Sequence, residues 1–146
     1  FQKAISLQPN NARNLFIDGM ALAEEGWDAE RDRNMQSAAA FYNAAVASYQ
    51  RALALEPKNA EGQMNLGKAW LRLRQPQHAI ASLREAIRIN DRYVAARNEL
   101  ATALAASGDL AAAQIEFRNV LAIDPNDETA GRGLALIQQL QERAKP

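Results

Sequence analysis

The chain contains no cysteine, a single histidine and few aromatic residues. Without cysteine there can be no disulfide, no thiolate metal site and no cysteine nucleophile, although oxidising and reducing compartments both stay open. No stretch approaches the roughly 18 consecutive apolar residues that a membrane span needs. Aromatic residues make up 6% of the chain and hydrophobic residues 48%, so alanine and leucine must supply much of the apolar content. This composition is typical of closely packed helices and predicts an all-α fold.

The chain also lacks an excess of charge of either sign. Seventeen basic and seventeen acidic residues give a formal net charge of +0, whereas a domain that binds a polyanion usually has an excess of Lys and Arg. Arg84, Arg88 and Arg92 do recur every four residues. Because no aromatic residues alternate with them to stack on bases, we interpret this stripe as an exposed helix face. Nucleic acid is therefore not expected as a partner.

One stretch and its copy 34 residues later organise the rest of the chain. Residues 60–93 read as two amphipathic helices in a hairpin, and equivalent residues return in residues 94–127. The equivalent pairs are Leu66 and Leu100, Gly67 and Ala101, Arg74 and Gly108, Ala79 and Ala113, Leu83 and Phe117, Ala86 and Val120, and Ile89 and Ile123. A helix-turn-helix pattern of this period, with small and large apolar residues at these positions, resembles the tetratricopeptide repeat (TPR) family.

The resemblance implies a right-handed α-α superhelix of TPR hairpins, in which each hairpin buries its remaining apolar face on the next. Residues that end helices set the register of the repeats, and they are Pro9, Pro57, Asp91 and Pro125. The expected division is a partial repeat at 1–9 that has only a second helix, repeats at 12–59, 60–93 and 94–127, and a C-terminal capping helix at 128–143. Because the chain starts inside a helix, we expect it to be a fragment.

The first complete repeat is longer than the others. Pro9 and Pro57 are 48 residues apart, so this repeat has 14 residues beyond the period of 34, which we place near residues 27–38. Fourteen residues are close to four helical turns, and about two extra turns on each helix would preserve both buried faces. A protruding helical hairpin is therefore predicted, with a disordered loop as the alternative. Within this repeat, Asp18 stands where an apolar residue is usual.

Two groups of polar residues could suggest chemistry. His78 and Ser82 are four residues apart on one helical face, but no acid is placed to orient the histidine and no nucleophile elbow surrounds the serine. The acidic insertion resembles a calcium-binding loop, yet Arg33 and Ala39 stand where an EF-hand requires Gly and Glu. We interpret these groups as an exposed helix start and a solvated, partly self-paired hairpin tip. We therefore predict no enzyme activity, no catalytic residue, no metal site and no cofactor.

The resemblance to TPR proteins places the working surface on the concave side of the superhelix, which the first helices of the repeats line. This surface commonly holds an extended peptide or a helix of a partner protein. The predicted groove residues are Arg13, Phe16, Ile17 and Met20 in the first repeat, Glu61, Met64, Asn65, Lys68, Leu71 and Arg72 in the second, and Asn98, Glu99 and Thr102 in the third. As an alternative, some of them pack against an upstream repeat or against the insertion.

One subtype of TPR domain, the carboxylate clamp for the C-terminal tail of cytosolic chaperones, can be compared position by position. It needs Lys and Asn in the first repeat, where this chain has Phe16 and Met20. It needs Asn in the second repeat, where Asn65 agrees, and Lys and Arg in the third, where this chain has Ala95 and Glu99. A cochaperone for chaperone tails is therefore not expected.

The sequence thus predicts a protein-protein interaction module that has a scaffold or adaptor role within a larger, bacterial-type protein and binds a protein or peptide partner. Two alternatives stay open. The chain could be a regulatory or substrate-recruiting arm of an enzyme, or it could form a homo-oligomer through the unpaired helix at residues 1–7. Neither the partner nor the compartment follows from the sequence, because a repeat scaffold is not tied to one ligand.

Overall fold

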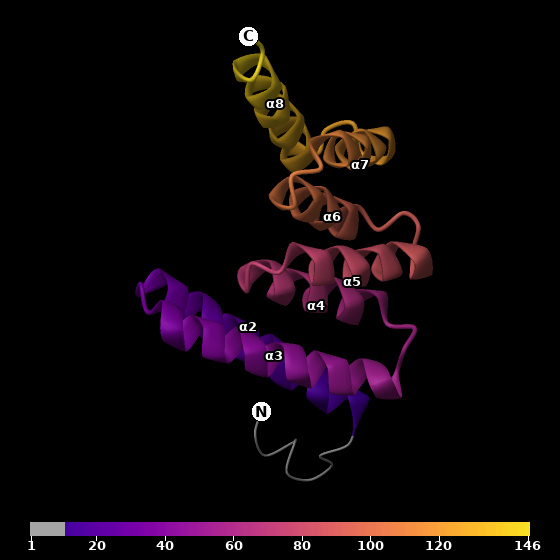
Figure 1. The fold of residues 1–146 in the computed structure, drawn as a ribbon. Helices are drawn as coiled ribbons and strands as arrows, with labels where there is room; N and C mark the ends of the chain where they lie inside the picture. Colours follow the sequence, from indigo (N-terminus) through magenta and orange to yellow (C-terminus); the bar gives the residue numbers. More distant parts are fainter. Residues whose placement is uncertain (1–10) are drawn as a thin grey trace.

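The computed structural model describes residues 11–146, and this part of the chain is helical without strands. The expected partial repeat at residues 1–9 lies outside the described residues. The helices in chain order are α2 (Ala12–Arg31), α3 (Met35–Leu55), α4 (Ala60–Arg72), α5 (Pro76–Ile89), α6 (Val94–Ala106), α7 (Leu110–Ile123) and α8 (Glu128–Arg143). Three hairpins, α2–α3, α4–α5 and α6–α7, stack in sequence, and α8 follows the last (Figure 1). The predicted all-α superhelix of hairpins is confirmed.

Side-chain caps and prolines set the ends of the helices. The backbone N–H of Gly62 donates to Oδ1 of Asn59 at 2.8 Å, and that of Ala130 donates to Oδ1 of Asp127 at 2.8 Å. Both acceptors precede the first helical residue and satisfy a donor that the helix itself leaves free. Pro76 opens α5, where its missing N–H removes no helical hydrogen bond.

The three hairpin turns share one backbone conformation. Arg33, Arg74 and Gly108 have positive φ angles of 60°, 56° and 92°. In the middle turn, the N–H of Arg74 donates to the carbonyl of Leu71, and the next N–H reaches the carbonyl of Trp70, both at 2.9 Å. Glycine adopts this left-handed conformation without strain, whereas arginine does not. The equivalence of Arg74 and Gly108 predicted from the sequence is therefore visible in the backbone.

The α2–α3 hairpin is longer than its neighbours because both of its helices are extended. Helices α2 and α3 have 20 and 21 residues, against 13 and 14 in α4 and α5. A Cβ atom on Gly19 would lie 2.6 Å from the ring of Tyr49, and one on Gly26 would lie 2.8 Å from the ring of Tyr42. The second contact repeats the first one seven residues farther along each helix. The additional turns thus form the predicted protruding helical hairpin and not a loop (Figure 1).

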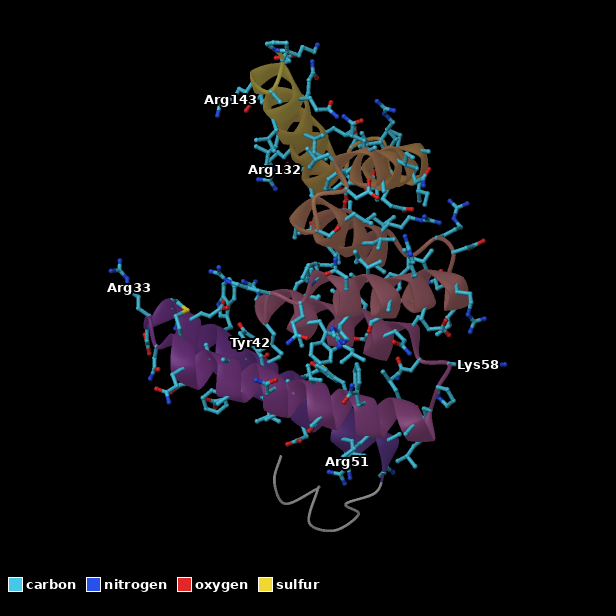
Figure 2. The ribbon with its side chains drawn as sticks, viewed as in Figure 1. Arg33, Tyr42, Arg51, Lys58, Arg132 and Arg143 are labelled. Atoms are coloured by element: carbon cyan, nitrogen blue, oxygen red, sulfur yellow. The ribbon has the colours of Figure 1, made fainter. Side chains whose placement is uncertain are left out.

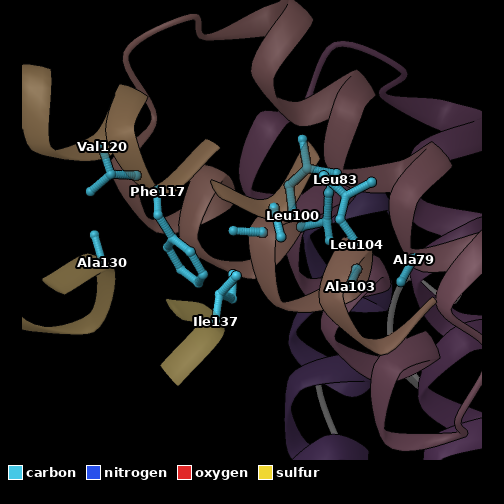
Figure 3. Packing of buried hydrophobic residues seen from close by; sticks show 11 residues of the cluster. Ala79, Leu83, Leu100, Ala103, Leu104, Phe117, Val120, Ala130 and Ile137 are labelled. Carbon is cyan, nitrogen blue, oxygen red and sulfur yellow. The ribbon is translucent and has the colours of Figure 1, made fainter. Parts of the chain in front are cut away.

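The core is formed by small residues between paired helices and larger ones between neighbouring hairpins. Ala79 and Ala113 are 0% exposed, as the close approach of the helices requires. Figure 3 shows Phe117 of α7 beside Ile137 of α8, within the cluster that also contains Leu83. Helix α8 therefore covers the apolar face that the α6–α7 hairpin would otherwise expose to water.

Asp18 occupies its unusual position because a polar partner faces it. The hydroxyl of Ser48 on α3 donates to Oδ2 of Asp18 at 2.5 Å, and Ser48 is 6% exposed. A buried hydroxyl without an acceptor would be unfavourable. The pair therefore joins α2 to α3 where an apolar contact is usual.

Candidate functional site

The candidate site is a hollow between the first helices α2 and α4. Most contacts of each of these helices are with its own hairpin partner, and only a few join α2 to α4. A cavity of about 240 Å³ lies between them, and we call it the α2–α4 cavity. Its lining residues are Ala23, Glu24 and Trp27 of α2, Tyr42 and Tyr49 of α3, and Asn65, Lys68, Ala69 and Arg72 of α4.

The α2–α4 cavity continues toward the tip of the long hairpin. Two neighbouring hollows have volumes of about 320 Å³ and 290 Å³. The first shares Tyr42 and Arg72 with the cavity, and the second shares Trp27 and Arg72. We call the three hollows together the trough. Another hollow, of about 640 Å³, is lined only by residues 56–60 of the α3–α4 loop; a single loop cannot enclose a ligand.

Arg72 is held in place by contacts with two residues of the extended part of α2. Its Nη1 atom lies 3.3 Å from Oε2 of Glu30. Its guanidinium carbon lies 4.5 Å from the ring centre of Trp27. An arginine cation over an indole face is stabilised by the ring quadrupole. One face of Trp27 is therefore occupied, while 49% of the residue stays exposed.

Tyr42 places a hydroxyl group in the wall of the cavity. The residue is 3% exposed, and its hydroxyl has no hydrogen-bond partner among the described residues. Burial, and then the nearby negative charge of Glu30, raise the pKa of Tyr42 to about 12. The Glu30 carboxylate thus influences the hydroxyl, although its position does not meet the geometry of a hydrogen bond. At neutral pH the hydroxyl is protonated and can donate to a ligand.

Three of the predicted groove residues, Asn65, Lys68 and Arg72, come together in this cavity. The other predicted apolar residues are divided between surface and core. Met20 is 41% exposed on α2. Half-buried residues that pack against the core clusters are Phe16, Met64 and Leu71. The remaining predicted residues of these two helices are exposed at Arg13 and Glu61 and half-buried at Ile17.

The predicted groove residues of the third repeat contact other parts of the fold. Nδ2 of Asn98 donates to Oδ1 of Asp127 at 3.1 Å, and the hydroxyl of Thr102 donates to the backbone carbonyl of Asn98 at 3.0 Å. Asp127 is also the cap of α8, so Asn98 helps to fix that helix. Glu99 is half-buried on the same helix. The third repeat is therefore less free to bind a ligand than the first two.

Sequence reasoning did not identify Trp27, Glu30 and Tyr42 as site residues. The TPR positions carried onto the chain stop before the extended turns, so these residues had no counterpart. A signal was nevertheless present, because Trp27 continues the helical spacing of Met20 and Ala23. Tyr42 could be found only from the structure, which places it against Gly26 and beneath α4.

The other polar groups considered in the sequence have structural contacts. The His78 ring stacks on Trp70 with 4.7 Å between the ring centres, and Ser82 is 9% exposed. In the acidic tip, Arg31 lies 3.1 Å from Asp28. Within residues 11–146, His, Cys, Asp and Glu form no group of three or more that could hold a metal ion. No helix in this part of the chain has the length and apolar character needed to cross a membrane.

Stacked helical hairpins with a hollowed inner side define a solenoid repeat protein. A family model described as TPR repeat matches residues 42–73, and one described as tetratricopeptide repeat matches residues 71–140. The two matches together cover more than half of the chain. The chain therefore belongs to the tetratricopeptide repeat family.

Comparison with individual proteins gives distant relatives. Small glutamine-rich tetratricopeptide repeat-containing protein 2 of Mycosarcoma maydis is 27% identical over 118 residues, which are 81% of this chain and 33% of that protein. This chain thus spans about a third of the length of that relative.

Two solved structures share the fold. The crystal structure of MamA matches with a TM-score of 0.77 and 23% identity, and the match covers 97% of this chain and 74% of that one. The second TPR domain of human RPAP3, in complex with the HSP70 peptide SGPTIEEVD, has a TM-score of 0.70 and 23% identity, with coverages of 88% and 98%. At these identities the likeness establishes the fold alone.

Proposed function

We propose that the chain is a non-enzymatic interaction module that holds a peptide or helix of a partner protein in its groove. By groove we mean the inner surface of α2, α4 and α6, with the α2–α4 cavity at its centre. The observation that carries the proposal is this cavity, which combines apolar walls with polar side chains that have no partner within residues 11–146. Ligand sites typically combine apolar walls with a few such polar groups. A scaffold role in assembly would follow from binding of this kind.

The exposed apolar residues of α2 support the same surface. Met20 and Trp27 are 41% and 49% exposed, and they lie seven residues apart on one face of the helix. Methionine adapts to irregular partners, and tryptophan is enriched among residues that dominate binding energy.

A peptide ligand is also supported by the relative of the same fold, human RPAP3, whose second TPR domain is in complex with an HSP70 peptide. Of the clamp residues named above, this chain has only Asn65. We therefore propose a peptide as the class of ligand, and not the chaperone tail itself.

The test is a selection of random peptides displayed on phage against the whole chain, followed by affinity measurements by fluorescence polarisation. The groove variant is Met20→Ala/Trp27→Ala. The control is Leu55→Ala/Ile115→Ala, which removes two apolar side chains that are 52% and 56% exposed on the second helices α3 and α7. We expect the selected peptides to bind the groove variant at least about tenfold more weakly than wild type and to bind the control normally. Equal affinities for both variants, or no selected peptide, would contradict the proposal.

A further inference from the structure

We propose that the α2–α4 cavity is a subsite for the carboxylate of a Glu or Asp side chain within the partner peptide, and that the extended turns of the long hairpin create it. This inference rests on the proposed function and names the chemistry that the groove recognises. If α2 had the length of α4, it would end near residue 24, and Trp27 and Glu30 would be missing. The subsite is thus built by the feature that distinguishes this hairpin from its neighbours.

Three hydrogen-bond donors without partners converge on the cavity. They are the Tyr42 hydroxyl, the Asn65 amide and the Lys68 ammonium group, and none of them has a hydrogen bond or ion pair within residues 11–146. The hydroxyl is buried, so the absence of an acceptor is unfavourable in the free protein. A carboxylate can accept several hydrogen bonds at once, and bonds to a charged acceptor are stronger than neutral ones. A bound carboxylate would therefore satisfy all three donors.

Other occupants fit the cavity less well. A cation would meet the charge of Lys68, and the face of Trp27 that could bind it already carries Arg72. A wholly apolar side chain would leave the Tyr42 hydroxyl and the ammonium group unsatisfied. The volume of about 240 Å³ is below the roughly 300 Å³ at which pockets for small molecules begin. It suits one side chain of a peptide better than a free cofactor.

The acidic residues near the cavity do not cancel its preference for an anion. Glu30 is paired with Arg72 at 3.3 Å. Glu24 is exposed to solvent at the rim, where water screens its charge. Because the trough continues beyond the cavity along the long hairpin, a peptide can pass through it. We therefore assign the carboxylate to a side chain and not to the end of a chain.

The experiment uses the peptides selected on the wild-type chain, synthesised with amidated C-termini so that only side chains carry carboxylates. In each peptide, acidic residues are replaced one at a time by their amides. The protein variants are Lys68→Gln and Tyr42→Phe, which remove one donor each. The controls are Lys58→Gln and Tyr93→Phe, the same changes outside the cavity; Figure 2 shows Lys58 on the far side of the molecule from Tyr42. Circular dichroism checks that every variant is folded.

We expect one acidic residue of the peptide to be required. Its replacement by the amide should weaken binding to wild type about tenfold to hundredfold, with little further loss on Lys68→Gln, because the partner of that carboxylate is already gone. Tyr42→Phe should behave in the same direction, and both control variants should bind like wild type.

The two proposals fail in different ways. Selected peptides that need Met20 and Trp27 but no acidic residue would overturn the carboxylate subsite and leave the groove intact. Equal losses from the amide replacement on wild type and on Lys68→Gln would also overturn it, because the carboxylate would then bind elsewhere. If the groove variant binds every selected peptide normally, the proposed function itself is wrong.

Discussion

Gly131 and Gly133 lie two residues apart on α8, and the same substitution by alanine should change stability in opposite directions at the two positions. A Cβ atom on Gly131 would meet nothing within 4 Å. A Cβ atom on Gly133 would lie 2.4 Å from the ring of Phe117, which is only 4% exposed and so has little room to move. Both substitutions gain roughly 0.5–1 kcal/mol from the better helix propensity of alanine. Only the second adds an overpacking cost of about 1–3 kcal/mol.

Urea denaturation followed by far-UV circular dichroism measures the difference. We expect Gly131→Ala to be more stable than wild type by about 0.5–1 kcal/mol. Gly133→Ala should be less stable than Gly131→Ala by about 1–3 kcal/mol, which corresponds to a difference of at least about 2 °C in melting temperature. The two variants share helix, chemistry and chain length, so propensity cancels in the comparison. Equal stabilisation by both would refute the packing of α7 on α8 described here.

Three other substitutions test the fold. Arg74→Gly should raise the free energy of unfolding by about 1 kcal/mol in thermal melts, because glycine accepts the φ angle of 56° without strain; a loss of stability would contradict the turn. Ala79→Phe should lower stability by about 1–3 kcal/mol, since Ala79 is 0% exposed, and an unchanged melting temperature would argue against the repeat register. The raised pKa of Tyr42 favours its protonated form in the folded state, so stability should fall as pH rises from about 10 toward about 12. Urea midpoints across this range should fall less for Tyr42→Phe, and an unchanged slope would contradict the burial of the hydroxyl.

The repeat architecture could be predicted because it depends on local and periodic features. Small and large apolar residues recur at fixed intervals, and prolines, Asn59 and Asp127 mark helix ends. Even the left-handed position at Arg74 follows from its equivalence to Gly108. The extra turns of the first repeat were also predictable, because an insertion that preserves both buried faces must be close to a whole number of helical turns.

The candidate site was only partly predictable, because it depends on contacts between residues far apart in the sequence. Asn65, Lys68 and Arg72 were expected from their TPR positions. The residues that complete the cavity, Trp27 and Tyr42, come from the extended turns, for which the family pattern offers no position. Likewise, periodicity could not reveal that Asn98 would be engaged by the cap of α8.

The central claim, that a partner peptide binds in the groove at the α2–α4 cavity, is tested most directly by following the side chains of the two tryptophans of the chain. In a ¹H–¹⁵N spectrum each gives one indole signal, which the variant Trp27→Phe assigns. Trp27 lines the cavity, whereas Trp70 stacks on His78 and is not among the lining residues. Titration with a selected peptide should shift the Trp27 signal strongly and the Trp70 signal little. A peptide that binds while the Trp27 signal stays unchanged would contradict the account.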